Sequence, residues 1–284
     1  MSTLSDAYAY CLTALKEVSR DHYLACLLMP EAIRSQMAAL FLFEMETARI
    51  RELVREPIPG EIRLQWWRDL LESDGDGADS GPLAHALKDV IARNNLPIKP
   101  FQDLLDARIF DLYDDPMGSV DEFELYAGET SSSLIQLGLV ICDPEHAREN
   151  ADAAGHAGVA VTVARVLRSL ATSKARGQIY IPQPMLTSVG LERAAYLQSQ
   201  GNDERMRALV EVFAGFGLDH LEKARQAYKP SKMSRWPFLS VALSGSAMQR
   251  SRKRGAAILD GAPVERGPLA RQWRLWRAAV SNRF

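Results

Sequence analysis

The chain has 284 residues, 47% of them apolar, and a formal net charge of −2, so it contains enough apolar material for one deep core. No stretch approaches the roughly 18 to 20 uninterrupted apolar residues that a membrane-spanning helix needs, so we expect no transmembrane segment. Cys11, Cys26 and Cys142 are odd in number and set among apolar neighbours. This favours reduced core thiols over disulfides or a metal site.

Charge is distributed unevenly along the chain. The segment 223–284 holds fourteen lysines and arginines but only Asp260 and Glu265, a net charge of +12 that leaves −14 for residues 1–222. Such a segment can form a basic surface that binds phosphates, anionic lipid or an acidic partner. The alternative is a set of dispersed, solvated arginines, which would give the same net charge. No nucleic-acid partner is expected, because no RRM, KH or helix-turn-helix signature accompanies the charge.

Apolar residues recur at intervals of three and four rather than two, which predicts helices almost throughout. A long helix is expected over 31–55, after Pro30 and ended by "PIPG" at 57–60. "EIRLQWWRDLLES" forms the next helix, before a surface loop at 74–81. Further helices are expected over 82–94, 101–114, 119–141, 145–175, 202–228, 235–259 and 266–280. With no repeat or βαβ alternation, the pattern predicts one all-α domain over 1–284, with a basic C-terminal segment over 223–284.

Three stretches, "ALFLFEMETARIREL", "YAGETSSSLIQLG" and "RVLRSLATSKARGQIYIP", resemble the squalene and phytoene synthases in order and spacing, and the similarity spans residues 10 to about 255. The resemblance implies an isoprenoid-synthase-like helical bundle around a central cavity, with the helix of 31–55 facing that of 145–175. It also implies two Asp-x-x-x-Asp pairs. Aspartates four apart share a helical face, so each pair can hold Mg²⁺ that bridges to a substrate diphosphate.

Both acidic motifs are degenerate in this chain. The aspartate positions fall on Ala48 and Glu52 in the first motif and on Ser169 and Ser173 in the second. Serine is a weak Mg²⁺ ligand and one glutamate cannot organise several ions. We therefore expect a pseudoenzyme with no catalytic residue, metal or cofactor. The alternative is an active isoprenoid (prenyl) transferase with an altered diphosphate site, which would use Mg²⁺.

The frame around the second motif is retained, and its polar positions are candidates for a ligand-binding pocket. These candidates are Thr162, Arg165, Arg168, Glu129, Arg176 and Tyr180. We favour the alternative that Ser169 and Ser173 bond to carbonyl groups within their own helix. The arginines would then pair with Glu46, Glu52 or Glu129 on facing helices.

Within the family, "FEMETARIRELVREPIPGEIRLQWWRDLL" is most similar to the branch that includes the mitochondrial complex I assembly factor 6. Members of that branch are regarded as non-catalytic relatives that associate with the inner face of a membrane and aid assembly of the respiratory NADH dehydrogenase. The resemblance implies a lipid- or protein-binding factor whose partners are complex I subunits or assembly factors, or an anionic lipid or isoprenoid. We expect a bacterial, cytoplasmic protein that is peripheral at the inner face of the membrane, since the start of the chain resembles neither a signal nor a transit peptide.

Two tryptophan pairs are candidates for membrane or partner contact. Trp66 and Trp67 are adjacent on a helix and cannot both face the core, so one of them should point at a groove or a neighbouring helix. Packing in the core is favoured over a role as a binding hot spot. In the last helix, two tryptophans share a face that suits an anionic bilayer surface, or both rings could instead cap the core. The candidates there are Trp273, Trp276, Arg271, Arg274 and Arg277.

The remaining titratable residues are expected to be structural. The five histidines show no metal-ligand spacing, so each should be exposed or satisfied in the interior; they are His22, His85, His146, His156 and His220. "DLYDDPMG" has the pattern of a helix end followed by a turn, which predicts solvated acids at Asp111, Asp114 and Asp115.

Overall fold

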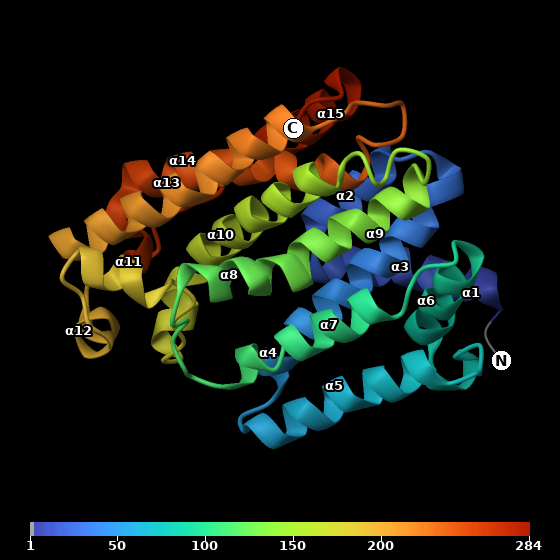
Figure 1. Ribbon diagram of the computed structural model, residues 1–284, viewed down its shortest axis with the longest axis horizontal. Helices are drawn as coiled ribbons and strands as arrows, with labels where there is room; N and C mark the ends of the chain where they lie inside the picture. The colour runs from blue at the N-terminus through green and yellow to red at the C-terminus, as the bar shows by residue number, and fades with distance from the viewer. Residues whose placement is uncertain (1–2) are drawn as a thin grey trace. The chain divides into compact units, whose positions relative to one another are not determined.

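In the computed structural model, which describes residues 3–284, every regular element is a helix and no strand occurs in that range (Figure 1). The predicted all-α class is therefore confirmed. The chain divides into two compact units: residues up to 113 with 133–151 and 229–240, and residues 114–132, 152–228 and 241–284. A single domain, and the facing of 31–55 and 145–175 across a cavity, stay predictions.

The first unit is organised around a helix that is apolar on almost every side. Its helices are α1 (Leu4–Val18), α2 (Arg20–Leu28), α3 (Glu31–Ala48), α4 (Ile50–Leu53), α5 (Pro57–Glu72), α6 (Pro82–Arg93), α7 (Lys99–Ala107) and α9 (Ser133–Cys142), with turns η1 (Ala78–Ser80) and η2 (Phe110–Leu112). Residues 37–43 of α3 are all buried, as expected for a helix surrounded by others. It packs against α1, α6 and α9. A capping box of Thr3 and Asp6 starts α1.

The second unit contains the two longest helices. Its elements are α8 (Val120–Ala127), the π-turn η3 (Gly128–Ser132), α10 (Ala151–Ala175), α11 (Gln183–Ser188), α12 (Arg193–Gln198), α13 (Glu204–Ala227), α14 (Ser244–Arg254), η5 (Gly255–Asp260) and α15 (Pro268–Ser281), while η4 (Pro237–Leu243) lies at a boundary between the units. The Asp203 side chain caps α13 by accepting from the N–H groups of Arg205 and Met206. α13 packs against the shorter α14, which runs beside it (Figure 1).

Two predicted boundaries near the first motif are wrong. "PIPG" does not end a helix but forms the first turn of α5, with Pro57 as its first residue. Proline suits that position because its φ is already helical and its missing N–H would have no partner there. The helix expected over 31–55 is interrupted at Arg49 (φ −89°, ψ −5°), where α3 ends and α4 begins.

The three cysteines are buried free thiols, as predicted. Burial raises the pKa of both Cys11 and Cys26 to about 12. Burial, with a smaller contribution from Asp143, also raises the pKa of Cys142. All three thiols are therefore protonated and poorly nucleophilic at neutral pH.

Candidate functional site

α10 carries the second pair of positions at which the resemblance implies metal ligands. Ser169 Oγ donates to the carbonyl oxygen of Arg165 at 3.1 Å, as predicted. The buried Ser173 Oγ donates to Ser169 Oγ at 3.4 Å, so it bonds to a hydroxyl rather than to the predicted carbonyl. Both hydroxyls therefore make hydrogen bonds within their own helix.

The first motif is altered in its backbone as well as in its residue types. Ala48 is the last residue of α3, and Glu52 lies on the short α4 beyond the interruption at Arg49. Ala48 offers no ligand atom, and Glu52 is exposed. Residues four apart share a face only on a continuous helix, so these positions do not build a two-carboxylate face.

The donor set at these four positions does not fit Mg²⁺. It comprises one methyl group, two hydroxyls that bond within α10 and one exposed carboxylate. Mg²⁺ requires near-octahedral oxygen coordination and is usually anchored by carboxylates. Within residues 3–284 there is also no group of three or more His, Cys, Asp or Glu side chains that could hold a metal ion. We therefore assign no reaction step to a metal at these positions.

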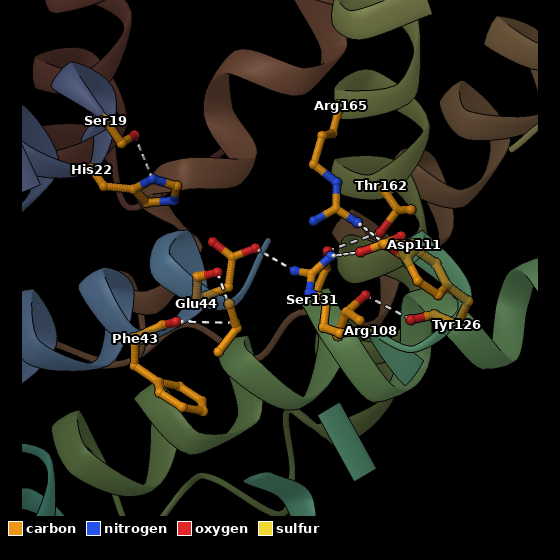
Figure 2. Close-up of polar contacts among 12 residues, drawn as sticks. Ser19, His22, Phe43, Glu44, Arg108, Asp111, Tyr126, Ser131, Thr162 and Arg165 are labelled. Carbon is orange, nitrogen blue, oxygen red and sulfur yellow. Dashed lines mark hydrogen bonds and ion pairs between the residues drawn. The ribbon is translucent and has the colours of Figure 1, made fainter. Parts of the chain in front are cut away.

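A polar cluster in the second unit joins α8, the π-turn and α10 (Figure 2). The Arg165 guanidinium donates to the Tyr126 hydroxyl at 3.3 Å and lies 5.7 Å from the centroid of that ring. The buried hydroxyls of Ser131 and Thr162 are 2.8 Å apart. The Thr130 hydroxyl bonds back to the Tyr126 carbonyl oxygen at 2.6 Å within the π-turn. A π-turn of this kind often marks a functional site, and here it carries Ser131 to α10.

"SKARGQIYIP" ends α10 with a glycine in the left-handed region. Gly177 has φ +81°, and the N–H of Gln178 donates to the carbonyl oxygen of Ser173 at 2.9 Å. This is the Schellman end of a helix, and glycine adopts it without steric cost. After it, the ring of Tyr180 lies 6.1 Å from the ring of Tyr126.

The structure brings together only some of the predicted ligand-binding candidates. Thr162, Arg165 and Tyr180 belong to the Tyr126 cluster. Glu129 lies in the same π-turn as Ser131, and Arg176 is exposed at the end of α10.

Arg168 lies outside this cluster. Its guanidinium pairs with the carboxylate of Glu265, which also lies 3.9 Å from Nε of Arg271. For Arg168, the predicted partners Glu46, Glu52 and Glu129 are therefore wrong. Glu265 is remote in sequence and lies between helices, so helical periodicity gave no signal for this pair.

Three charged side chains that helical periodicity does not predict are buried together in the first unit (Figure 2). Arg108 donates to Glu44 at 2.9 Å and to Asp111 at 3.2 Å, and all three residues are buried. The prediction that Asp111 is solvated is wrong, whereas Asp114 and Asp115 are exposed as predicted. Removing one member of a buried ion pair typically costs about 3–5 kcal/mol, so this triad is structural in the first instance.

A second unpredicted cluster contains two histidines from different helices. Nδ1 of His156 on α10 lies 3.1 Å from Nδ1 of His220 on α13, and Nε2 of His220 lies 3.3 Å from Glu124 on α8. Burial lowers the pKa of His220; the Glu124 carboxylate opposes this shift and His156 adds to it. His220 is thus a satisfied interior histidine, as predicted, but its partners come from two other helices, α8 and α10, which the sequence alone does not align.

The tryptophans divide between core and surface. Trp67 is buried, with its ring 5.0 Å from that of Phe43, whereas Trp66 is exposed. Trp273 and Trp276 are 61% and 46% exposed, and their stacked rings are 4.9 Å apart. The alternative in which both of these rings cap the core is therefore wrong. No helix within residues 3–284 is long and apolar enough to span a bilayer.

Solved structures define the class of fold. A dehydrosqualene synthase crystallised with a ligand superposes with a TM-score of 0.81 at 18% identity, over 98% of this chain and 97% of that chain. The squalene synthase HpnC from Alicyclobacillus acidocaldarius gives a TM-score of 0.72 at 18% identity, over 89% and 95% of the two chains. The fold is the all-α isoprenoid synthase fold.

The squalene/phytoene synthase sequence pattern matches residues 15–281, and the chain belongs to this family. It is 29% identical to the rat protein named NADH dehydrogenase (ubiquinone) complex I, assembly factor 6, over 78% of this chain and 66% of that protein. The human protein of the same name is 28% identical over 80% and 68%. The 15-cis-phytoene synthase of Synechococcus elongatus is 25% identical over 84% and 80%. The chain thus spans about two thirds of the rat and human relatives.

Proposed function

We propose that this chain is a non-catalytic member of the family and acts by binding partner proteins during the assembly of respiratory complex I. The observation that carries the proposal is the donor set where the family resemblance implies metal-binding aspartates. Ala48 has no ligand atom, and the hydroxyls of Ser169 and Ser173 are held within α10. A diphosphate leaving group needs its negative charge neutralised as it departs, which metal ions do in metal-dependent catalysis. These side chains do not provide the ligands that such metal ions need.

The class of partner is supported by the relatives. The rat and human proteins carry a name that refers to complex I assembly, and each aligns with more than three quarters of this chain. The similarity to a phytoene synthase is compatible with a shared ancestor that was an enzyme. A chain that keeps the fold and loses the metal ligands retains large surfaces for binding.

We place the protein-binding surface on the exposed side of α5. Ile58, Ile62 and Trp66 lie four residues apart along this helix and are all exposed, so they form one apolar stripe. Trp67, on the opposite side, is buried and anchors the helix. An exposed tryptophan within an apolar stripe is a typical binding hot spot, which favours a protein partner here.

The test measures assembled respiratory NADH dehydrogenase on native gels, in cells that lack the gene and in cells that express variants. Loss of the gene should lower the amount of assembled enzyme, and the wild-type chain should restore it. The double variant Ile62→Glu, Trp66→Ala should restore much less, because a charge and a truncated ring disrupt the stripe. Leu125→Glu, an exposed leucine on α8, is the matched control and should restore assembly fully. An undiminished level of assembled enzyme without the gene would refute the proposal.

A further inference from the structure

α15 presents an apolar stripe away from the body of the second unit. Leu269, Trp273, Trp276 and Val280 are all exposed, and their spacing of four, three and four places them on one helical face. The other side of the helix packs inward through Leu275, Ala278 and Ala279, which are buried.

The far end of α15 is fixed to the end of α13. The Tyr228 hydroxyl donates to Oδ1 of Asn282 at 2.7 Å, and Nε of Arg225 donates to the backbone oxygen of Phe284 at 2.7 Å. The rings of Tyr228 and Phe284 pack edge to face, 5.1 Å apart. These contacts hold α15 with its stripe turned outward.

Beside the stripe, α15 lines a hollow of about 340 Å³ whose polar groups are mainly arginines. Arg274, Arg277 and Arg283 line it together with Arg225 of α13, and no acidic residue is among its described lining residues. Burial lowers the pKa of Arg274, and the positive charges of Arg266, Arg277 and Arg225 lower it further. Arginine nevertheless stays charged at physiological pH, so the hollow gathers four guanidinium groups, of which the one on Arg225 already contacts the Phe284 oxygen, and an anion would offset the charges further.

The apolar stripe and the arginine-lined hollow lie next to each other on α15, as the helical period shows. Arg277 follows Trp276 directly, and Arg274 lies one turn before Ala278 on the side between the stripe and the buried face. Arg271, the third predicted arginine of this flank, is instead beside Glu265. The surface therefore offers adjacent apolar rings and guanidinium groups, which is the composition of a helix lying at a bilayer surface.

We propose that α15 docks on the surface of an anionic phospholipid bilayer, with its tryptophans at the headgroup level and a lipid phosphate in the arginine hollow. Guanidinium groups bind phosphate oxygens in a bidentate manner. A free phosphate would satisfy the arginines but leave the tryptophan stripe exposed to water, whereas a bilayer accommodates both. The net charge of +12 on residues 223–284 adds long-range attraction to an anionic leaflet. This inference is independent of the proposed function.

The test is sedimentation of the full chain with vesicles of phosphatidylcholine, with and without about one third phosphatidylglycerol. The chain should sediment with the anionic vesicles, less so as salt rises, and remain in the supernatant with neutral ones. Trp273→Ala with Trp276→Ala should abolish sedimentation. Arg274→Gln with Arg277→Gln should weaken binding about 30-fold, from the loss of two basic contacts.

The matched control is Arg205→Gln with Arg207→Gln, which removes the same charge about 30 Å away along α13. It should bind nearly as the wild type does, and far-ultraviolet circular dichroism should show that every variant keeps its helices. Equal weakening by the two arginine pairs would show diffuse attraction and overturn the proposal. Calorimetric titration with inorganic phosphate is the further arm. Binding of phosphate that depends on Arg274 and Arg277, without sedimentation with anionic vesicles, would assign the hollow to a free anion and also overturn it.

Discussion

His220 lies in the interior of the second unit between His156 and Glu124, and its pKa is lowered chiefly by burial. The folded state therefore binds this proton less readily than the unfolded chain does. As the pH falls below about 6.5, the unfolded state is protonated first and the free energy of unfolding decreases. The decrease continues down to the lowered folded pKa, with a slope below the ~1.4 kcal/mol per pH unit that one proton permits. Above about 6.5 this residue contributes no pH dependence.

The variant His220→Gln should flatten this dependence, measured by urea unfolding at several values between about pH 5 and pH 8. His146→Gln is the contrasting control. The pKa of His146 is raised by its hydrogen bond to Asp143, so its contribution is present below the unfolded pKa and is lost as the pH rises through the folded pKa. An acid dependence as steep in His220→Gln as in the wild type would contradict our assignment.

At single positions, the sequence predicted those side-chain contacts that depend only on neighbours within one helix. Ser169 bonds to Arg165 as expected, because that contact is set by helical geometry alone. The partner of Arg168 was predicted wrongly because Glu265 is remote in sequence. The burial of Asp111 was predicted wrongly because its partner Arg108 also pairs with Glu44, which is remote in sequence. Long-range ion pairs leave no periodic signal in a single sequence.

Among the helices, α13 contains two glycines whose surroundings differ. A Cβ at Gly217 would lie 2.4 Å from the sulfur of Met248 on α14 and 2.6 Å from Cγ1 of Val163 on α10. A Cβ at Gly215 would meet nothing within 4 Å. Gly217 is therefore the point of close approach between these helices, whereas Gly215 only lowers helix propensity.

We predict opposite effects of alanine at the two positions. Gly217→Ala should destabilise the protein by about 1–3 kcal/mol, because the added methyl group overpacks a close contact. Gly215→Ala should stabilise it by up to about 1 kcal/mol through helix propensity. Chemical denaturation of both variants gives the comparison. Equal effects of the two substitutions would show that α13 does not pack tightly at Gly217.

The existence of most long helices followed from apolar periodicity, but their ends did not. α13 and α15 lie close to their predicted ranges of 202–228 and 266–280. The helix predicted over 119–141 contains the π-turn η3, which a period of 3.6 does not indicate. The pattern predicts Pro57 as the end of a helix, whereas it is the first residue of α5. A proline is compatible with both roles, and only the packing of its neighbours decides between them.

For the whole chain, the sequence alone was sufficient for the fold and the family, because its three motifs resemble one family in order and spacing, and the family pattern matches residues 15–281. It was not sufficient for function, since the family includes relatives named as assembly factors and as synthases. The distinction depends on which atoms occupy the metal positions and what those atoms already bond to. The Ser173 hydroxyl donates to the Ser169 hydroxyl, which in turn donates to a carbonyl oxygen of the same helix. These hydrogen bonds are a property of the folded chain.

Release of diphosphate is the direct test of whether the chain is an enzyme. The protein is incubated with Mg²⁺ and farnesyl or geranylgeranyl diphosphate, a synthase with both aspartate pairs serves as the positive control, and released diphosphate is measured through a coupled pyrophosphatase. We predict no release above the protein-free background, for the wild type and for Glu52→Gln alike. Steady release by the wild type that is abolished in Glu52→Gln would contradict this prediction and identify the chain as a working transferase.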